Sequence, residues 1–312
     1  MSRLLLLGML SAAFFSSTFV LNRGMSVEGG HWFWTGSLRY AYMLVFLVAG
    51  LLCTKGRGHL AEVAGVFRRF WRFWIAAGSV GFGIFYALLA FSASYAPGWI
   101  IATTWQVTIL ATPAVLLVFG KRVPVRGLLL TGLIFSGIVL VNLAHAGTAT
   151  AVEVLFGVLP VLGAAFAYPL GNQMVWEATQ HGSRLIPRIE HPVMQDPFSR
   201  ILLLTAGSVP FWLLLFPLVS PPPPSPGQLV STAIVALLSG VVATAIFFHA
   251  RHLCVHPYEL AAVDATQSME VVFSLAGEII FLGGTFPTPL GIAGIAVTII
   301  GLTAYTRQHY AG

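Results

Sequence analysis

The stretch FWIAAGSVGFGIFYALLAFSASYAPGWIIATTWQVTILATPAVLLVF, residues 73–119, decides the fold class because it contains no aspartate, glutamate, lysine or arginine. A helix that crosses a bilayer needs about 20 mostly apolar residues, so this run is long enough to cross twice. The residues from Ser94 to Pro97 divide the run, and serine and proline favour a turn. We therefore predict two membrane-spanning helices, 73–92 and 98–119, joined as a tight hairpin.

Apolar stretches of similar length continue on both sides of this hairpin. The chain of 312 residues is 57% hydrophobic and only 8% charged, with a mean hydropathy of +0.86, whereas soluble domains carry about 25% charged residues. We predict an all-α polytopic membrane protein without a soluble domain, and count the N-terminal stretch as a span rather than a cleaved signal peptide. The ten predicted transmembrane helices are 4–22, 35–53, 73–92, 98–119, 127–145, 153–176, 201–219, 229–250, 257–282 and 288–305.

The loops between the predicted spans differ in charge from one side of the membrane to the other. The loops on the side of the N-terminus hold fourteen lysine and arginine residues, whereas those on the opposite side hold only Arg23. Lysine and arginine accumulate in cytoplasmic loops. We therefore predict a multi-pass protein of the bacterial inner membrane with both termini in the cytoplasm.

Several other classes of protein are disfavoured. The net charge of +6 comes from residues at the ends of apolar stretches, so we expect membrane lipid and no nucleic acid as a partner. Cys53 and Cys254 lie far apart, which argues against a disulfide framework. His249, His252 and His256 could share a helical face, but no carboxylate or cysteine set completes a metal site. Sequence motifs for phosphate binding or hydrolysis are also missing, so we expect no metal, no cofactor and no enzymatic activity.

The two halves of the chain, residues 1–147 and 148–312, resemble one another weakly. Thr103-Thr104-Trp105-Gln106 has a counterpart 161 residues later in Asp264-Ala265-Thr266-Gln267, and the spans 127–145 and 288–305 are both rich in glycine. Small residues let helices approach closely. A unit of five spans that is repeated in tandem inverts its topology, and such transporters bind substrate near the middle of the membrane. We predict two inverted five-helix repeats that form one membrane domain.

Four of the ten acidic residues lie in the span 257–282, namely Glu259, Asp264, Glu270 and Glu278. On a helical wheel at about 100° per residue, these four and Gln267 share an arc of less than half the circumference. Ionisable groups at this depth usually face a cavity or a polar partner. We predict a proton- or substrate-binding face here. A structural alternative is that Glu259 and Glu278, near the two ends, reach water.

Other polar side chains in the spans are candidates for the lining of a cavity. Arg39 either extends to the outer surface or pairs with an acid of the span 257–282. Trp105 and Gln106 lie deep in the span 98–119 and form either a substrate wall or a contact between helices. Weaker candidates of the same kind are Asn22, Tyr40, Tyr168, Asn172 and Gln173.

Several strings of sequence resemble the multidrug resistance efflux transporter family of the drug/metabolite transporter superfamily. They are FFSSTFVLNR at residues 14–23, Gly29-Gly30-His31-Trp32, Ser37-Leu38-Arg39-Tyr40, and ELAAVDATQ at residues 259–267, continuing through Glu270 to Gly277-Glu278. The resemblance implies ten helices in an inverted repeat, an inner-membrane location and export of small molecules.

The chain also departs from patterns that the superfamily shows. Gly277-Glu278 matches a Gly-Glu pair near the end of the fourth helix of each half, but the first half has Gly120-Lys121 instead. The small four-helix exporters of the superfamily carry a coupling glutamate in their first helix, and the span 4–22 contains no acid. The resemblance therefore places any coupling group in the span 257–282.

Our functional hypothesis is a secondary active transporter that exports small cationic or amphipathic drug-like molecules in exchange for protons. Asp264 and Glu270 are the predicted proton-binding pair. One alternative is a metabolite exchanger or facilitator that does not use protons. An alternative from another class is a non-transporting scaffold or a lipid-modifying enzyme, for which the sequence offers no converging nucleophile or metal ligands. The sequence leaves a homodimer open.

Overall fold

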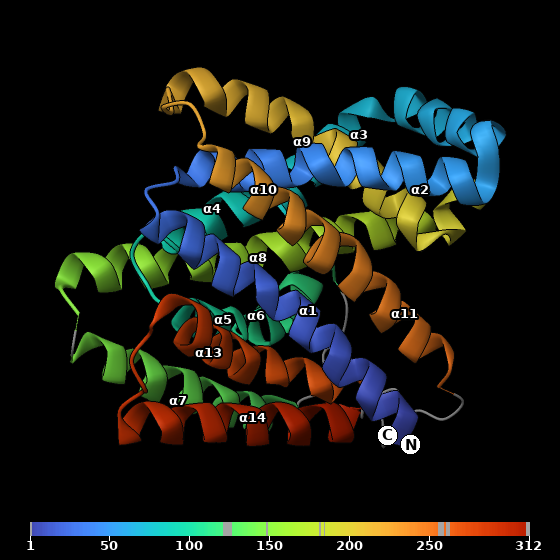
Figure 1. Ribbon diagram of the computed structural model, residues 1–312. Coiled ribbons are helices and arrows are strands. Elements are labelled where there is room, and N and C mark those ends of the chain that lie inside the picture. The colour runs from blue at the N-terminus through green and yellow to red at the C-terminus, as the bar shows by residue number, and fades with distance from the viewer. Residues whose placement is uncertain are drawn as a thin grey trace.

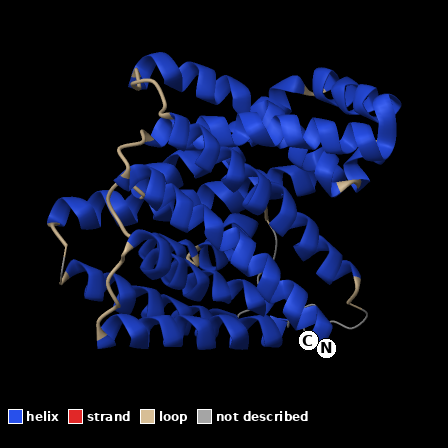
Figure 2. Ribbon diagram, viewed as in Figure 1, coloured by secondary structure: helices blue, strands red, loops and turns tan. Residues whose placement is uncertain are grey.

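The computed structural model describes residues 2–120, 127–147, 149–180, 182–183, 185–254, 259 and 263–309. These residues form helices and connecting loops without a β-strand (Figure 2). Two apolar segments, Gly132–Ala146 and Pro289–Ala304, lie within helices of 20 and 21 residues, Gly127–Ala146 and Pro289–His309. The all-helical prediction is confirmed, and the count of ten spans stays a prediction. Among the described residues, eight other helices are long and apolar enough to cross a membrane: Ser2–Val27, Trp32–Arg69, Trp71–Ser92, Gly98–Val118, Ala151–Gln180, Pro197–Val219, Pro226–His252 and Val263–Leu282.

Figure 1 shows these helices packed together as one bundle. Several spans are divided into shorter elements. In chain order the elements are α1 (Ser2–Val27), α2 (Trp32–Arg69), α3 (Trp71–Gly78), η1 (Ser79–Ile84), α4 (Phe85–Ser92), α5 (Gly98–Trp105), α6 (Thr108–Val118), α7 (Gly127–Ala146), α8 (Ala151–Gln180), η2 (Pro192–Gln195), α9 (Pro197–Val219), α10 (Pro226–Val235), η3 (Ala236–Ala243), α11 (Thr244–His252), η4 (Thr266–Ser268), α13 (Met269–Leu282) and α14 (Pro289–His309).

The hairpin predicted from residues 73–119 is present. Helix α4 ends at Ser92, and Pro97 directly precedes α5 with its backbone in an extended conformation. Proline suits this position because it has no N–H to leave unpaired at the start of a helix. The beginning of the predicted span 257–282 falls partly outside the described residues.

Within the described residues of the spans predicted from sequence, α-helical geometry is interrupted at four places. Two are π-helical segments, η1 and η3. The others are a break at Gln106–Val107 between α5 and α6, and the 3₁₀ turn η4. Such interruptions free backbone groups and turn the following side chains to new directions, and they are frequent at functional sites. Their places correspond between the third and eighth, and between the fourth and ninth, predicted spans.

Helix α2 is longer than the predicted span 35–53 because it continues to Arg69. It bends at Gly56, where φ is +81°, a backbone conformation that glycine adopts without a Cβ clash. Figure 1 shows the segment after this bend running in a different direction from the first part of α2. We call residues 57–69 the α2 arm. Val63 and Val66 of the arm are buried, so it is packed onto the bundle.

Helix α1 lies in the interior of the bundle, in contact with η3 and α11 of one span and with α13 of another. Helix α8 packs in a similar way against η1, α4 and α6. Helices α7 and α14 lie side by side along one edge of the bundle (Figure 1). They approach so closely that a Cβ added to Gly294 would lie 2.8 Å from the carbonyl oxygen of Gly137.

Candidate functional site

Arg39 of α2 forms the centre of a polar cluster inside the bundle. Its Nη1 donates hydrogen bonds to Thr18 Oγ1 and to Tyr86 Oη, each at 2.9 Å, and its Nη2 donates to Ser239 Oγ at 3.1 Å. The guanidinium carbon lies 4.4 Å from the centre of the Tyr86 ring, in cation–π geometry. The side chain therefore connects four helical elements: α1, α2, α4 and η3.

The surroundings of Arg39 match neither of its two predicted orientations. Arg39 is only 9% exposed, so it does not extend to the membrane surface. In the described part of the chain it forms no ion pair with an acid. Both predictions failed because they assumed that the charge needs water or a carboxylate, whereas three hydroxyl groups from distant helices receive its hydrogen bonds.

Two further predicted residues lie at this cluster. Tyr86 Oη donates to Asn22 Oδ1 at 3.1 Å, and Thr18 Oγ1 donates to Ser239 Oγ at 2.7 Å. We call Thr18, Asn22, Arg39, Tyr86 and Ser239 the Arg39 cluster. Tyr40, one residue after Arg39, packs beside it, with its ring edge-on to that of Tyr86 at 5.6 Å.

Trp105 belongs to a group of three aromatic rings. Its ring centre lies 5.0 Å from that of Phe85 and 5.6 Å from that of Tyr168, and the last two are 5.0 Å apart. We call these residues the aromatic triad. They come from α4, α5 and α8. Gln106 does not join them, because its amide donates to the carbonyl oxygen of Ala102 in its own helix at 3.2 Å.

Glu270 lies in the first turn of α13 and is 9% exposed. Its carboxyl group has no hydrogen bond or ion pair among the described residues. Its helix α13 packs against α1 and against α5, which carries Trp105 of the aromatic triad. One turn further along α13, Ser274 is fully buried and its hydroxyl has no partner in the described part of the chain. Glu270 is thus a buried ionisable group on a helix that packs against an element of the aromatic triad.

The other predicted groups of this span have different surroundings. Asp264 forms a hydrogen-bonded ion pair with Arg251 near the end of α11. Gln267, in η4, donates to the carbonyl oxygen of Gly8 at 3.4 Å. The helical wheel assumed an unbroken α-helix, but η4 interrupts it between Asp264 and Glu270. The backbone therefore does not place these groups on one helical face.

Glu278 and Glu259, the acids near the two ends of the predicted span 257–282, also have separate surroundings. Glu278 is 7% exposed, and its carboxylate accepts the backbone N–H of Trp99 at 3.3 Å, at the start of α5. A carboxylate at a helix N-terminus satisfies free N–H groups and stabilises the helix. Glu278 is therefore buried, and the structural alternative, in which it reaches water, is wrong for this residue. Glu259 is half-buried and lies between residues outside the described part of the chain.

Sequence reasoning missed several members of this site. Thr18, Ser239, Phe85 and Tyr86 were not among the candidates, whereas Tyr168 was a weaker candidate. Hydroxyl and aromatic residues are common in membrane helices, so their types alone do not mark a site. The adjacent aromatic pair Phe85-Tyr86, in a run without charges, was the one available hint.

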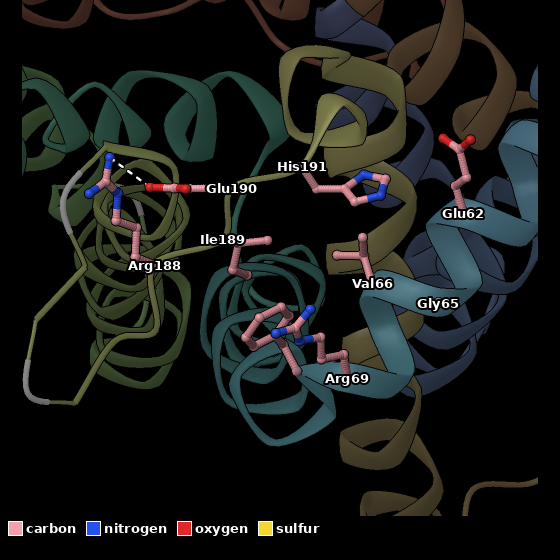
Figure 3. A pocket seen from close by; sticks show the side chains of 9 residues that line it. Glu62, Gly65, Val66, Arg69, Arg188, Ile189, Glu190 and His191 are labelled. Atoms are coloured by element: carbon pink, nitrogen blue, oxygen red, sulfur yellow. Dashed lines mark ion pairs between the residues drawn. The ribbon is translucent and has the colours of Figure 1, made fainter.

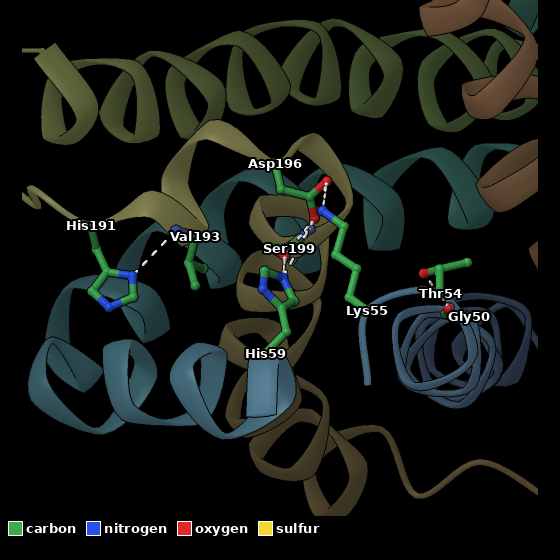
Figure 4. A network of polar contacts seen from close by, with 8 residues as sticks. All are labelled: Gly50, Thr54, Lys55, His59, His191, Val193, Asp196 and Ser199. Carbon is green, nitrogen blue, oxygen red and sulfur yellow. Dashed lines mark hydrogen bonds and ion pairs between the residues drawn. The ribbon is translucent and has the colours of Figure 1, made fainter. Parts of the chain in front are cut away.

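A second polar network lies at the α2 bend, outside the apolar core (Figure 4). Lys55 Nζ lies 2.7 Å from Asp196 Oδ1, and His59 Nε2 lies 2.8 Å from Ser199 Oγ. Asp196 also accepts the backbone N–H of Ser199 at 2.9 Å, which caps the start of α9. This network ties the bend in α2 to α9.

A surface cavity of about 570 Å³ lies beside this network (Figure 3). Its walls are the α2 arm, Phe70 and residues 188–191, which include Arg188 and Glu190 in an ion pair of 2.8 Å. It shares no residue with the Arg39 cluster, the aromatic triad or Glu270. We therefore base the functional site on the buried groups rather than on this cavity.

The Asp196 network leads to a prediction about pH. Burial raises the pKa of the Asp196 carboxyl, but hydrogen bonds from Lys55 and Ser199 and the charge of Lys55 outweigh it and hold the pKa below its usual value. A carboxyl with a lowered folded-state pKa stabilises the protein above its unfolded-state pKa, and this stabilisation disappears as pH falls through the folded-state value. Asp196→Asn keeps a helix cap but loses the ion pair.

We expect Asp196→Asn to reduce stability at pH 7 by about 0.5–1 kcal/mol, because Lys55 is partly exposed and solvent screens the pair. Thermal unfolding of the purified protein in detergent, followed from pH 7 to pH 3, measures this. The difference between wild type and variant should shrink at acid pH. A difference that stays constant over this range would show that the charge of Asp196 contributes nothing.

Comparisons with known proteins cover almost the whole chain. The family model described as "EmrE: Putative multidrug resistance efflux transporter" matches residues 2–310. The uncharacterized protein YjlA of Bacillus subtilis (strain 168) is 39% identical over 318 aligned positions, which cover 97% of this chain and 94% of YjlA. An uncharacterized 42.1 kDa protein from the intracellular alkaline protease 3′ region of Shouchella clausii is 37% identical, covering 98% of this chain and 76% of its own.

A solved structure described only as "Crystal structure of protein" superposes with a TM-score of 0.63 at 15% sequence identity. The match covers 99% of this chain and 98% of the other. At this low identity the match shows a shared fold alone.

Proposed function

Because the chain belongs to the multidrug resistance efflux transporter family, we propose that it is a proton-coupled exporter of small organic molecules with a cationic or amphipathic part. The membership confirms the resemblance seen in FFSSTFVLNR and the related strings. The protein is a multi-pass membrane protein of a transporter family. Our proposal places it in the bacterial inner membrane with both termini in the cytoplasm, in accordance with the charges of its loops.

The observation that carries the proposal is the position of Glu270. It is a buried carboxyl group in a membrane span, without a cation partner in the described part of the chain, and its helix α13 packs against α5, which carries Trp105. Carboxyl groups inside membrane spans are costly and commonly serve as proton or ion sites. Glu270 as a carboxylate would attract a cationic group, and the faces of Trp105, Tyr168 and Phe85 would add cation–π attraction.

Coupling follows from competition at this one carboxyl group. A proton on Glu270 removes the negative charge that holds the cationic group, so proton and substrate bind alternately. The proton gradient across the membrane then supplies the free energy for export. Asp264 has its own cation in Arg251, so we assign it a positioning role and leave proton transfer to Glu270.

We further propose that residues 1–147 and 148–312 are inverted repeats. The support is an approximate correspondence of contacts: α1 packs on η3 and α13, and α8 packs on η1 and α6. The π-helical segments and the two breaks next to Gln106 and Gln267 also occur at matching places. In such architectures the substrate site lies near the middle of the membrane between the repeats.

Transport by the purified protein in proteoliposomes tests this function. With an inward-acidic gradient imposed, we expect lipophilic cations such as tetraphenylphosphonium and ethidium to accumulate, and a protonophore to abolish their accumulation. Cation movement that is indifferent to the gradient but stimulated by substrate on the opposite side would instead favour the proton-independent exchanger. A preparation that is folded and moves none of a broad panel of cations and metabolites would contradict a transporter.

A further inference from the structure

The guanidinium group of Arg39 is a buried positive charge without a negative partner in the described part of the chain. All the groups that accept its hydrogen bonds are neutral hydroxyls, those of Thr18, Tyr86 and Ser239. Neutral acceptors satisfy the N–H groups but leave the charge itself uncompensated. An unpaired charge inside a membrane protein is expensive, and such residues generally face a partner or a substrate.

The cluster also leaves hydrogen-bond donors unused. Arg39 Nε is buried and has no partner among the described residues. Ser239 Oγ accepts hydrogen bonds from both Arg39 and Thr18, and no acceptor for its own proton lies within the described part. A hydroxyl has one proton to donate. Positive charge and two free donors at one place are the features of a site for an anionic group.

The Arg39 cluster is next to the proposed cation site. Tyr86 of the cluster and Phe85 of the aromatic triad are consecutive residues, and their rings are 5.7 Å apart. Helix α13, which carries Glu270, packs against α1, which carries Thr18 and Asn22 of the cluster, and against α5, which carries Trp105 of the triad. Glu270 thus lies on a helix that is a direct neighbour of elements of both the cluster and the triad.

We propose that the transported molecule is a zwitterion whose acidic group, a carboxylate or a group of similar size, pairs with Arg39. This inference rests on the proposed function and specifies its substrate class. The amine would bind at Glu270, the apolar part on the aromatic triad, and the acid at Arg39. In this arrangement Arg39 selects the substrate by its acidic group, whereas Glu270 exchanges the proton.

Matched pairs of arylalkyl amines with and without a carboxylate test the proposal. Benzylamine and 4-(aminomethyl)benzoate form one pair, and homologues with shorter and longer spacers complete the series. In proteoliposomes we expect wild type to transport at least one carboxylated member with a kcat/KM about tenfold or more above that of its parent amine, the range of one close charge pair. Arg39→Gln should lose this preference and still transport the amine, and Arg39→Lys should retain part of it.

The controls separate selection from bracing of the helices. Arg23→Gln changes another arginine, which donates to the Ala93 carbonyl oxygen outside the cluster, and should keep the preference. Tyr86→Phe keeps the charge of Arg39 and loses one of its hydrogen bonds, so it should retain part of the preference while the melting temperature falls. The proposal is overturned if wild type prefers no carboxylated member, or if Arg39→Gln lowers transport of both members of every pair by the same factor.

The same experiment distinguishes this inference from the proposed function. If wild type binds or exchanges carboxylated members preferentially but without response to a pH gradient, proton coupling fails and the role of Arg39 stands. If amines are driven by the gradient with no preference for the carboxylate, the role of Arg39 fails and the proposed function stands.

Discussion

Glu270→Gln is expected to reduce gradient-driven transport to the level of empty liposomes. Glutamine has nearly the same shape as glutamate but can neither release a proton nor carry a negative charge. Glu270 has no ion pair to lose in the described part of the chain, so the variant should fold with a melting temperature close to that of wild type. The measurement is uptake of a lipophilic cation under an imposed pH gradient, together with thermal unfolding in detergent.

Asp264→Asn is the matched control, an acid-to-amide change six residues away in the same span. Its carboxylate is paired with Arg251, so its loss should lower stability and slow transport while the response to the gradient remains. Transport by Glu270→Gln that still follows the gradient would remove Glu270 from the coupling mechanism. If Asp264→Asn alone abolished the response, the proton site would be Asp264 and the assignment drawn from the structure would be wrong.

Gly137→Ala is expected to destabilise the contact between α7 and α14. A Cβ at this position would lie 2.6 Å from the backbone nitrogen of Thr298 and 2.8 Å from the carbonyl oxygen of Gly294. Backbone atoms of a packed helix cannot move aside as a flexible side chain can, so the two helices must separate. Overpacking of this kind costs about 1–3 kcal/mol, which we expect as a clearly lower melting temperature in detergent.

Gly132→Ala provides the matched control on the same helix. Nothing lies within 4 Å of a Cβ built at Gly132, and alanine is favoured over glycine inside a helix by about 0.5–1 kcal/mol. This variant should be as stable as wild type or slightly more stable. Equal melting temperatures for the two variants would mean that α7 and α14 do not pack as closely as described.

The class of the protein and part of its site could be predicted without the structure. The hairpin at 73–119 is present with its turn before Pro97, and Glu270 was recognised as a candidate because a carboxyl group in an apolar span is conspicuous. The sequence pattern also brought Asn22, Arg39 and Tyr40 forward as candidates. It did not show that Arg39 and Asn22 share the hydroxyl of Tyr86.

The remaining features depend on the arrangement of the helices. Asp264 and Glu270 seemed equivalent on a uniform wheel, but the 3₁₀ turn η4 lies between them and gives them different neighbours. The α2 arm was not anticipated, because the spans were predicted from apolar runs and this run ends before Lys55. The helix itself continues through the bend at Gly56 to Arg69.

Hydropathy and the charges of loops act locally and accumulate along the chain, so the amino-acid sequence is enough to identify a helical membrane protein. Which polar groups meet depends on the tertiary structure. Thr18, Arg39, Tyr86 and Ser239 come from four elements that are separated by up to 221 residues, and their meeting depends on how those helices cross. The angles at which helices cross depend on the fit of small residues and on local breaks in helical geometry. The composition of a single span says little about either.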